Sequence, residues 1–174
     1  MDRRDYCEII SFKKEHINPI AEISYKLWGN GGLYSYKNYN NWVNGGISFT
    51  LKVNYKVAGC CLCDNLGNGV CSIDLLLIDN IHENKGYGSI LFKFCLDYLK
   101  TNKFIFCKLY VCTKNYKAMH LYEKFGFERI KFVRNYYIND KDKDAFIMGK
   151  YLDKQYYNNN NIYNNYNYYY YYYY

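Results

Sequence analysis

The chain has 174 residues, enough for one domain with a sizeable core, and it carries a formal charge of +7 with a pI near 8.8. The excess charge forms no basic run or basic helix, which disfavours nucleic acid and favours a small anionic partner. No apolar run approaches the roughly 18 residues needed to span a bilayer, so we expect no membrane partner.

The N-terminal part predicts a strand followed by a helix. Residues 5–12 contain regularly placed apolar side chains and are predicted to form the strand. A helix is expected from Lys14 to Trp28, where Pro19 is tolerable only in the first turn. Asn30-Gly-Gly32 ends it, and residues 34–42 are ambiguous between a short helix and a loop. The apolar face of the helix consists of Ile17, Ile20, Ile23 and Leu27.

Three consecutive antiparallel strands are predicted next. Residues 47–53 and 56–64 form a hairpin around Asn54-Tyr55. A second turn at 65–69 ends in Asn-Gly and leads into a buried strand, Ser72–Ile78, which is a short apolar run bounded by turn residues.

The joint after this strand predicts an anion-binding site. A polar turn from Asp79 to Gly88 precedes an amphipathic helix from about Ser89 to Leu99. Gly86 and Gly88 let the backbone approach a ligand closely, and the helix start supplies unpaired N–H groups and a positive dipole end. A phosphate or pyrophosphate is the usual anion there, and the alternative is an ordinary tight turn. The predicted buried face of the helix is Leu91, Phe94, Cys95, Tyr98 and Leu99.

The rest of the chain completes a mixed sheet. Residues 104–112 predict a strand, Asn115 is a good N-cap for the next helix, and Gly126 suits the left-handed position after its end. Two last strands, residues 127–138 and 145–151, flank the charged loop 139–144. The order β-α-(α)-β-β-β-α-β-α-β-β predicts an α/β fold, a mixed and mainly antiparallel sheet with helices on both faces.

The composition changes abruptly from Gln155 onward. Asn and Tyr dominate, and no charged side chain follows Lys154. We therefore expect a folded domain over residues 1–153 and a low-complexity tail over 154–174. The tail is interpreted as a disordered appendage without a chemical role, and the alternative is an aggregation element.

The eight cysteines raise the question of disulfides or a metal. The start of the chain, Met1–Cys7, lacks the apolar segment of a signal peptide, so we expect a reducing, cytoplasmic location and mostly buried thiols. Cys60 and Cys63 form a Cys-x-x-Cys pair, but no second pair stands at zinc-site spacing. Structural strand residues are therefore favoured over metal ligands, and we expect no metal.

Two blocks resemble the GNAT acetyltransferase superfamily. Glu83-Asn-Lys-Gly-Tyr-Gly88 resembles its acetyl-CoA loop, Gln/Arg-x-x-Gly-x-Gly/Ala, and Asn115-x-x-Ala-x-x-Leu-Tyr122-x-Lys-Phe-Gly-Phe127 resembles the helix beside the pantetheine arm. The resemblance implies acetyl-CoA as acetyl donor, a GNAT-type sheet, and a strand that splays from its neighbour to admit pantetheine. The cofactor-binding residues that it implies are Leu76, Leu77, Ile78, Glu83, Asn84, Lys85, Gly86, Tyr87, Gly88, Ser89, Asn115 and Tyr122.

A third block narrows the branch. Arg134-Asn-Tyr-Tyr137, followed by Asp144-Ala-x-x-Met148, resembles the end of N-terminal protein acetyltransferases, the RimI and NatE-like enzymes. The resemblance implies that Asn135, Tyr136 and Tyr137 lie on a hairpin that clamps the acceptor peptide. The alternative is that the two tyrosines are ordinary strand aromatics.

The resemblance also implies a proton donor, Tyr122, which would protonate the departing thiolate of CoA. A phenol with a pKa near 10 stays protonated at neutral pH, so it is suited to this role. The alternative is an aromatic helix residue that packs on the sheet.

The general base is less clearly marked. Tyr110 stands at a strand position where RimI-like enzymes carry Glu and NatE-like enzymes carry His, and tyrosine is a poor base at neutral pH. Asp74 lies two residues after Ser72 on the same strand face. We expect Asp74 to act through a water that Tyr110 and Ser72 orient, and the alternative is a structural carboxylate.

Glu83 departs from the family pattern, which has Gln or Arg at this position. Its carboxylate would repel a pyrophosphate, although Lys85 and the loop amides would offset the repulsion. We therefore expect the departure to affect the affinity for the coenzyme more than the identity of the coenzyme.

The expected activity is acetyl transfer to a primary amine by direct attack, with a protein or peptide N-terminus as acceptor. An α-amine with a pKa of about 8 is far more often neutral at pH 7 than a lysine at about 10.4, a gap of roughly 3.4 kcal/mol, so a site without a strong base suits the α-amine or an amino sugar. Two alternatives remain open: a glucosamine-6-phosphate-type N-acetyltransferase, and a non-catalytic CoA-binding subunit. An auxiliary subunit or the ribosome is a further potential partner.

Overall fold

The computed structural model describes residues 5–29, 34–137 and 144–153. Within these residues, seven strands form one sheet in the order β1-β2-β3-β4-β5-β7-β6. Only the β4–β5 pair is parallel, and every other neighbouring pair is antiparallel. The strands are β1 Cys7–Ser11, β2 Phe49–Val53, β3 Lys56–Gly67, β4 Val70–Ile78, β5 Phe106–Cys112, β6 Glu128–Val133 and β7 Ala145–Tyr151.

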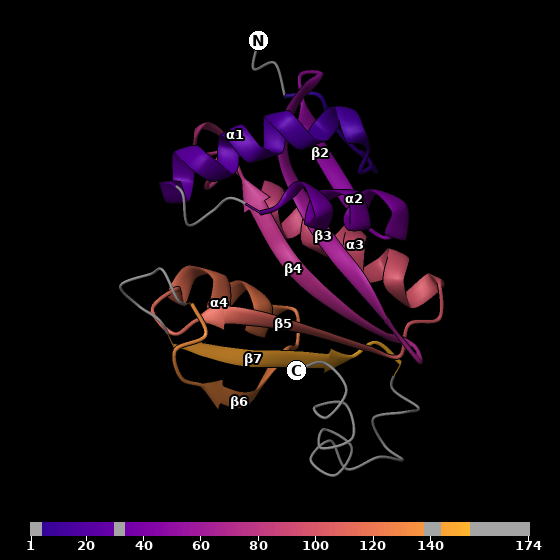
Figure 1. Ribbon diagram of the computed structural model, residues 1–174, viewed down its shortest axis with the longest axis vertical. Coiled ribbons are helices and arrows are strands. Elements are labelled where there is room, and N and C mark those ends of the chain that lie inside the picture. Colours follow the sequence, from indigo (N-terminus) through magenta and orange to yellow (C-terminus); the bar gives the residue numbers. More distant parts are fainter. Residues whose placement is uncertain (1–4, 30–33, 138–143, 154–174) are drawn as a thin grey trace.

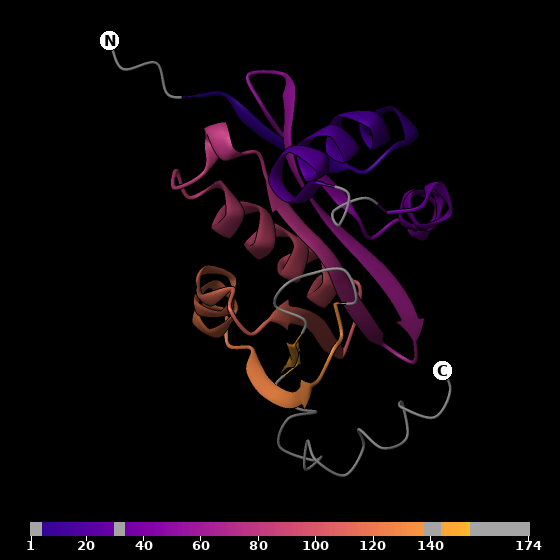
Figure 2. The ribbon, with the colours of Figure 1, turned by 60° about the vertical axis from the view of Figure 1, so that its left-hand side comes forward.

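Helices cover both faces of the sheet, as predicted (Figures 1 and 2). On one face, α1 and α2 pack on β3 and β4 around buried residues such as Ile20, Trp42 and Leu62. On the other face, α3 and α4 pack around Phe92, Leu99 and Met119. The helices are α1 Ile17–Trp28, α2 Tyr36–Gly45, α3 Tyr87–Thr101 and α4 Tyr116–Lys124, with short 3₁₀ turns at Lys14–His16 and Asn80–His82.

Strands β4 and β5 separate along their length. Their hydrogen-bonded pairing runs only from Val70↔Phe106 to Ile73↔Leu109, whereas β4 continues to Ile78 and β5 to Cys112. The two strands start close together and diverge, which gives the V shape visible in Figure 1. The wedge between them exposes strand edges that a ligand backbone can reach.

A β-bulge in β4 lies where this separation begins. The register with β3 shifts between Leu62↔Leu75 and Cys63↔Ile73, so one extra β4 residue is inserted. As a result, Asp74 contacts Trp42 of α2 and the next residue, Leu75, packs in the same α1–α2 core. A bulge of this kind re-aims side chains, and here it turns a carboxylate toward the α1–α2 face.

The secondary structure corrects several sequence predictions. The helix predicted from Ser89 begins at Tyr87, because Gly86 takes the left-handed conformation that precedes it. Phe94, predicted to be core, is 40% exposed and lies at the helix edge, where its ring packs on Phe49. The strand predicted over residues 127–138 ends at Val133, since a turn follows. The charged loop at 139–143 and the tail lie outside the described residues.

The two residues of the Cys-x-x-Cys pair lie in separate environments. Cys60 and Cys63 face opposite sides of β3, because successive strand residues alternate, so the Cys-x-x-Cys pair does not converge on one site. Cys63 instead lies near Cys61 and near Cys95 of α3, and the three Sγ atoms are all within 4.8 Å of one another. These thiols are fully buried in the apolar core.

Candidate active site

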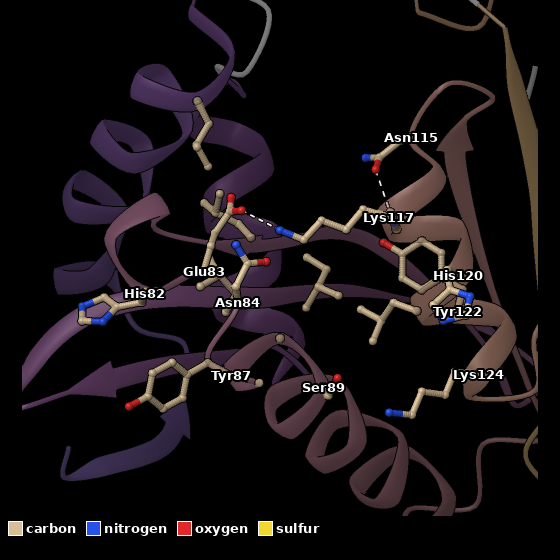
Figure 3. A pocket seen from close by; sticks show the side chains of 18 of the residues that line it. His82, Glu83, Asn84, Tyr87, Ser89, Asn115, Lys117, His120, Tyr122 and Lys124 are labelled. Atoms are coloured by element: carbon tan, nitrogen blue, oxygen red, sulfur yellow. Dashed lines mark hydrogen bonds and ion pairs between the residues drawn. The ribbon is translucent and has the colours of Figure 1, made fainter. Parts of the chain in front are cut away.

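A cleft of about 460 Å³ opens between the start of α3 and the exposed side of α4 (Figure 3). Its floor is the separated end of β4, and the loop before α3 forms one wall. Residues of α4 form the opposite wall, and the end of α1 contributes two apolar side chains. We call this feature the α3–α4 cleft; its lining residues are Leu27, Trp28, Leu76, Leu77, Ile78, His82, Glu83, Asn84, Gly86, Tyr87, Gly88, Ser89, Asn115, Lys117, Ala118, His120, Leu121, Tyr122 and Lys124.

The N-terminus of α3 faces this cleft. Its N-cap is Gly86, with φ +84°, a conformation that glycine adopts without strain. Among the described residues no side chain caps this end, so the amides of the first turn, Tyr87 to Ser89, are available to a ligand. Unpaired N–H groups and the positive end of the helix dipole together favour an anion at this place.

The predicted cofactor-binding residues come together in the cleft, with one exception. Lys85 does not line it; its ammonium lies 3.8 Å from the Asp5 carboxylate. Asp5 also accepts hydrogen bonds from Asn54 and from the Tyr87 hydroxyl, and these bonds lower the pKa of its carboxyl. Asp5 thereby ties the loop before α3 to the β2–β3 turn.

The charge of Glu83 is balanced by a residue that the sequence analysis did not single out. The Glu83 carboxylate lies 2.6 Å from the ammonium of Lys117, across the cleft on α4 (Figure 3). The partner expected to offset Glu83 was Lys85, which pairs elsewhere. Lys117, His120 and Lys124 share one side of α4, and their helical spacing after Asn115 is the signal that would have found them.

Asn115 and Tyr122 of the second motif lie on the same wall. Asn115 caps α4, since its Oδ1 accepts a hydrogen bond from the Ala118 amide, 3.1 Å away, as predicted. Tyr122 is 8% exposed, its ring packs 5.3 Å from that of Phe92, and its hydroxyl points into the cleft. Burial raises the pKa of the Tyr122 phenol well above its usual range, so it stays protonated.

Asp74 lies outside the lining of the cleft, on the α1–α2 side of β4. One carboxylate oxygen accepts a hydrogen bond from Ser72 (2.6 Å) and the other from the Trp42 indole (3.1 Å). Ser72 therefore contacts the carboxylate directly. Burial raises the pKa of Asp74 to about 6, the nearby Asp64 adds to the rise, and the two hydrogen bonds oppose it.

Aromatic side chains gather between Asp74 and Tyr122. Tyr34 donates a hydrogen bond to the Asp74 carbonyl, and Tyr110 stacks on Tyr136 with ring centroids 4.2 Å apart. Tyr137 packs edge-on against Tyr136 at 4.8 Å. Burial raises the pKa of Tyr137, and both Tyr34 and Tyr122 lie near enough to contribute to the rise.

Asn135 shapes the turn that carries the paired tyrosines. It adopts φ +52°, and its backbone N–H donates a hydrogen bond to the carboxylate of Asp144, 3.0 Å away. The tyrosines consequently lie in a loop after β6, where the strand alternative does not apply. The contribution of Tyr34 and Trp42 had no clear signal in the sequence, because the segment before α2 carries no motif.

Comparison with known proteins identifies the family. The model described as the acetyltransferase (GNAT) family matches residues 17–127, more than half of the chain. The chain belongs to the GNAT acetyltransferase family. The matched segment contains both the loop before α3 and the Asn115–Tyr122 motif. No curated protein sequence matches the chain.

Solved structures with the same GNAT fold are numerous. Arabidopsis thaliana Naa50 in complex with the bisubstrate analogue CoA-Ac-MVNAL has a TM-score of 0.75 at 23% identity, covering 83% of this chain and 97% of that one. The ribosomal-protein-S18-alanine N-acetyltransferase of Escherichia coli has a TM-score of 0.77 at 23% identity, covering 85% and 95%. Similarity at this level of identity establishes the mixed α/β GNAT fold.

A third structure, Ard1 of Thermoplasma volcanium, has a TM-score of 0.74 at 21% identity, with 83% of this chain and 97% of that chain covered. None of the helices in the described residues combines the length and apolar character needed to cross a membrane.

Proposed function

We propose that this GNAT protein transfers an acetyl group from acetyl-CoA to the α-amine of a protein or peptide N-terminus, by direct attack in a ternary complex. The observation that carries the proposal is the uncapped N-terminus of α3, which opens into a cleft leading along the separated end of β4 to the Tyr122 hydroxyl. The cleft suits a long carrier with a diphosphate at one end and a thioester at the other.

The acceptor proposal rests on residues that lie outside the lining of the cleft, on the Asp74 side of the molecule. Tyr34 and Trp42 donate hydrogen bonds to Asp74. Three further tyrosines pack on one another, and Tyr34 acts electrostatically on one of them, Tyr137. This aromatic group consists of Tyr34, Trp42, Tyr110, Tyr136 and Tyr137. Naa50, in a complex with an analogue that joins CoA to a peptide, and the S18-alanine acetyltransferase share the fold. These likenesses favour a peptide α-amine over other amines.

In the proposed reaction the amine nitrogen attacks the thioester carbonyl carbon, a C–N bond forms, and the C–S bond breaks. The neutral amine becomes positively charged at nitrogen when the C–N bond forms, and this nitrogen passes a proton to Asp74 through a water. A carboxylate with a pKa of about 6 is mostly ionised at pH 7, and it is a stronger base than an ordinary aspartate.

Tyr122 has the complementary role at the sulfur. Because burial keeps the phenol protonated, it donates a hydrogen bond to the leaving thiolate as negative charge develops. Its raised pKa makes it a weak acid, so stabilisation of the sulfur by the hydrogen bond precedes full proton transfer.

The test offers the protein acetyl-CoA together with free-amine peptides, N-terminally blocked peptides that contain lysine, and glucosamine 6-phosphate. We expect acetylation of the free-amine peptides, identified by mass spectrometry. Tyr122→Phe is expected to lower turnover about a hundredfold while CoA affinity is kept, because it removes only the proton donor. Tyr98→Phe, on the far side of α3, is the matched control and is expected to leave turnover unchanged.

Each alternative predicts a different result. Turnover of glucosamine 6-phosphate alone would favour the amino-sugar enzyme. CoA binding without acetylation of any acceptor, and no difference between Tyr122→Phe and the wild type, would favour a non-catalytic subunit.

A further inference from the structure

One ion pair spans the mouth of the α3–α4 cleft. Glu83 belongs to the loop before α3 and Lys117 to the first turn of α4, 34 residues further along the chain. The carboxylate and the ammonium are 2.6 Å apart, and both residues line the cleft (Figure 3). The Lys117 side chain is 66% exposed and that of Glu83 36%, so neither is locked in place by packing.

The position of Glu83 creates a conflict with an anionic ligand. Its carboxylate lines the same cleft as the first-turn amides of α3, where a diphosphate is expected to bind. Two anions in one cleft repel each other unless a cation lies between them. Lys85, the lysine of the loop before α3, pairs with Asp5 and does not line the cleft.

Lys117 is able to resolve this conflict. A lysine ammonium is a point charge on a flexible four-carbon stem, so it can turn from a carboxylate to a phosphate without moving the helix. An exposed ion pair is weak, whereas a hydrogen bond between an ammonium and a phosphate inside a cleft is stronger. The exchange of Lys117 from the Glu83 carboxylate to a phosphate therefore favours binding of the ligand.

We propose that Lys117 binds a phosphate of the coenzyme and that Glu83 competes for the same ammonium in the unliganded protein. Coenzyme binding then breaks the Glu83–Lys117 pair. The inference rests on the proposed function insofar as the ligand is CoA, and it assigns to Glu83 the role of a competitor that lowers coenzyme affinity. Glu83 would thus set the affinity for CoA without taking part in the acetyl transfer.

Calorimetric titration with CoA tests this competition in three variants of the full-length protein. Glu83→Gln removes both the competitor and its charge, so CoA is expected to bind about threefold to fivefold more tightly. Lys117→Met removes the ammonium group that binds the phosphate and leaves Glu83 without its partner Lys117. CoA is therefore expected to bind at least about tenfold more weakly. The double variant is expected to bind more tightly than Lys117→Met, because the unpaired carboxylate is gone.

A second exposed ion pair provides the matched control. Lys93 and Asp97 are 2.5 Å apart on α3 and do not line the cleft. Lys93→Met and Asp97→Asn are expected to leave CoA affinity unchanged. Thermal unfolding without CoA is expected to stay the same in all the variants, which separates a direct effect on binding from a structural one.

Two results would overturn the inference. Weaker CoA binding in both Glu83→Gln and Lys117→Met would show that the pair supports the shape of the cleft and does not compete with the ligand. Affinities equal to those of the Lys93 and Asp97 controls would show that neither residue meets the coenzyme. In both cases wild-type binding of CoA would leave the proposed function intact, whereas a wild type that does not bind CoA contradicts both proposals.

Discussion

The Asp74 carboxylate is held by two hydrogen bonds and is largely removed from water, and these effects act on its pKa in opposite directions. Burial dominates and raises the pKa to about 6, while the bonds from Ser72 and Trp42 hold the carboxylate in one orientation. An oriented carboxylate with a pKa just below neutrality is well matched to general-base catalysis at pH 7.

This environment predicts a pH dependence. The kcat/KM of the wild type is expected to rise through a pKa near 6 as Asp74 ionises, followed by a second rise near pH 8 from the acceptor amine. Asp74→Asn is expected to lower kcat/KM about a hundredfold or more and to remove the lower rise only. Asp97→Asn, on the exposed side of α3, is the control.

The same pKa shift has a consequence for stability. Because the folded state raises the pKa above the ordinary value of 3.8, the folded protein binds more protons than the unfolded chain between pH 4 and 6. Asp74 therefore contributes a loss of stability as pH rises through this range. Asp74→Asn removes that loss, so between pH 4 and pH 6 the free energy of unfolding of the variant is expected to fall less than that of the wild type.

In the kinetic experiment, an unchanged pH–rate profile in Asp74→Asn would instead identify Asp74 as a structural carboxylate.

At the scale of elements, the two glycines at the start of α3, Gly86 and Gly88, have different roles, although the sequence alone does not distinguish them. Gly86 has φ +84°, so its conformation requires glycine, although a Cβ there would meet open space. Gly88 lies within the helix, and a Cβ would meet only the Ile78 side chain at an ordinary 3.7 Å. The fold therefore needs Gly86, whereas Gly88 is free to serve the approach of a ligand.

The two glycines predict opposite effects of alanine. Gly88→Ala is expected to keep or raise the unfolding temperature, because alanine favours a helix by up to about 1 kcal/mol, and to weaken CoA binding about tenfold by obstructing the phosphate. Gly86→Ala is expected to destabilise the protein by about 1 kcal/mol. Calorimetry and thermal unfolding measure both effects. Unchanged CoA affinity in Gly88→Ala would mean that the phosphate does not approach this turn.

Much of the element pattern was predictable because local signals agree with the fold. The Ala145–Tyr151 strand, the Asn115 cap and Gly126 follow turn and capping chemistry that acts over a few residues. The end of β6 was not predicted, since aromatic residues continue past Val133 and only the left-handed Asn135 turn interrupts the strand. Phe94 fits the helical spacing, yet its side chain is 40% exposed at the border of the buried face, where its ring packs on Phe49.

At the scale of the whole molecule, the site depends on contacts between segments far apart in the sequence. The Glu83–Lys117 pair and the Trp42–Asp74 hydrogen bond join residues 34 and 32 positions apart. The bulge that turns Asp74 toward Trp42 arises from the register with β3. Such features follow from tertiary packing, so the sequence indicated the glycine-containing turn before α3 but neither Lys117 nor the setting of Asp74.

The separation of β4 and β5 is the global feature that joins these parts. Parallel pairing that stops at Ile73↔Leu109 opens a wedge between the two halves of the sheet, as the family resemblance implied. The turn before α3 and Tyr122 both line the resulting cleft, and the aromatic group near Asp74 lies outside its lining. We therefore expect one coenzyme molecule to occupy the cleft of each chain.

Calorimetric titration of the purified protein with CoA tests this expectation most directly. We expect saturable binding with one site per chain, and an upward shift of the unfolding temperature that grows with CoA concentration. The absence of both binding heat and a thermal shift would contradict the account.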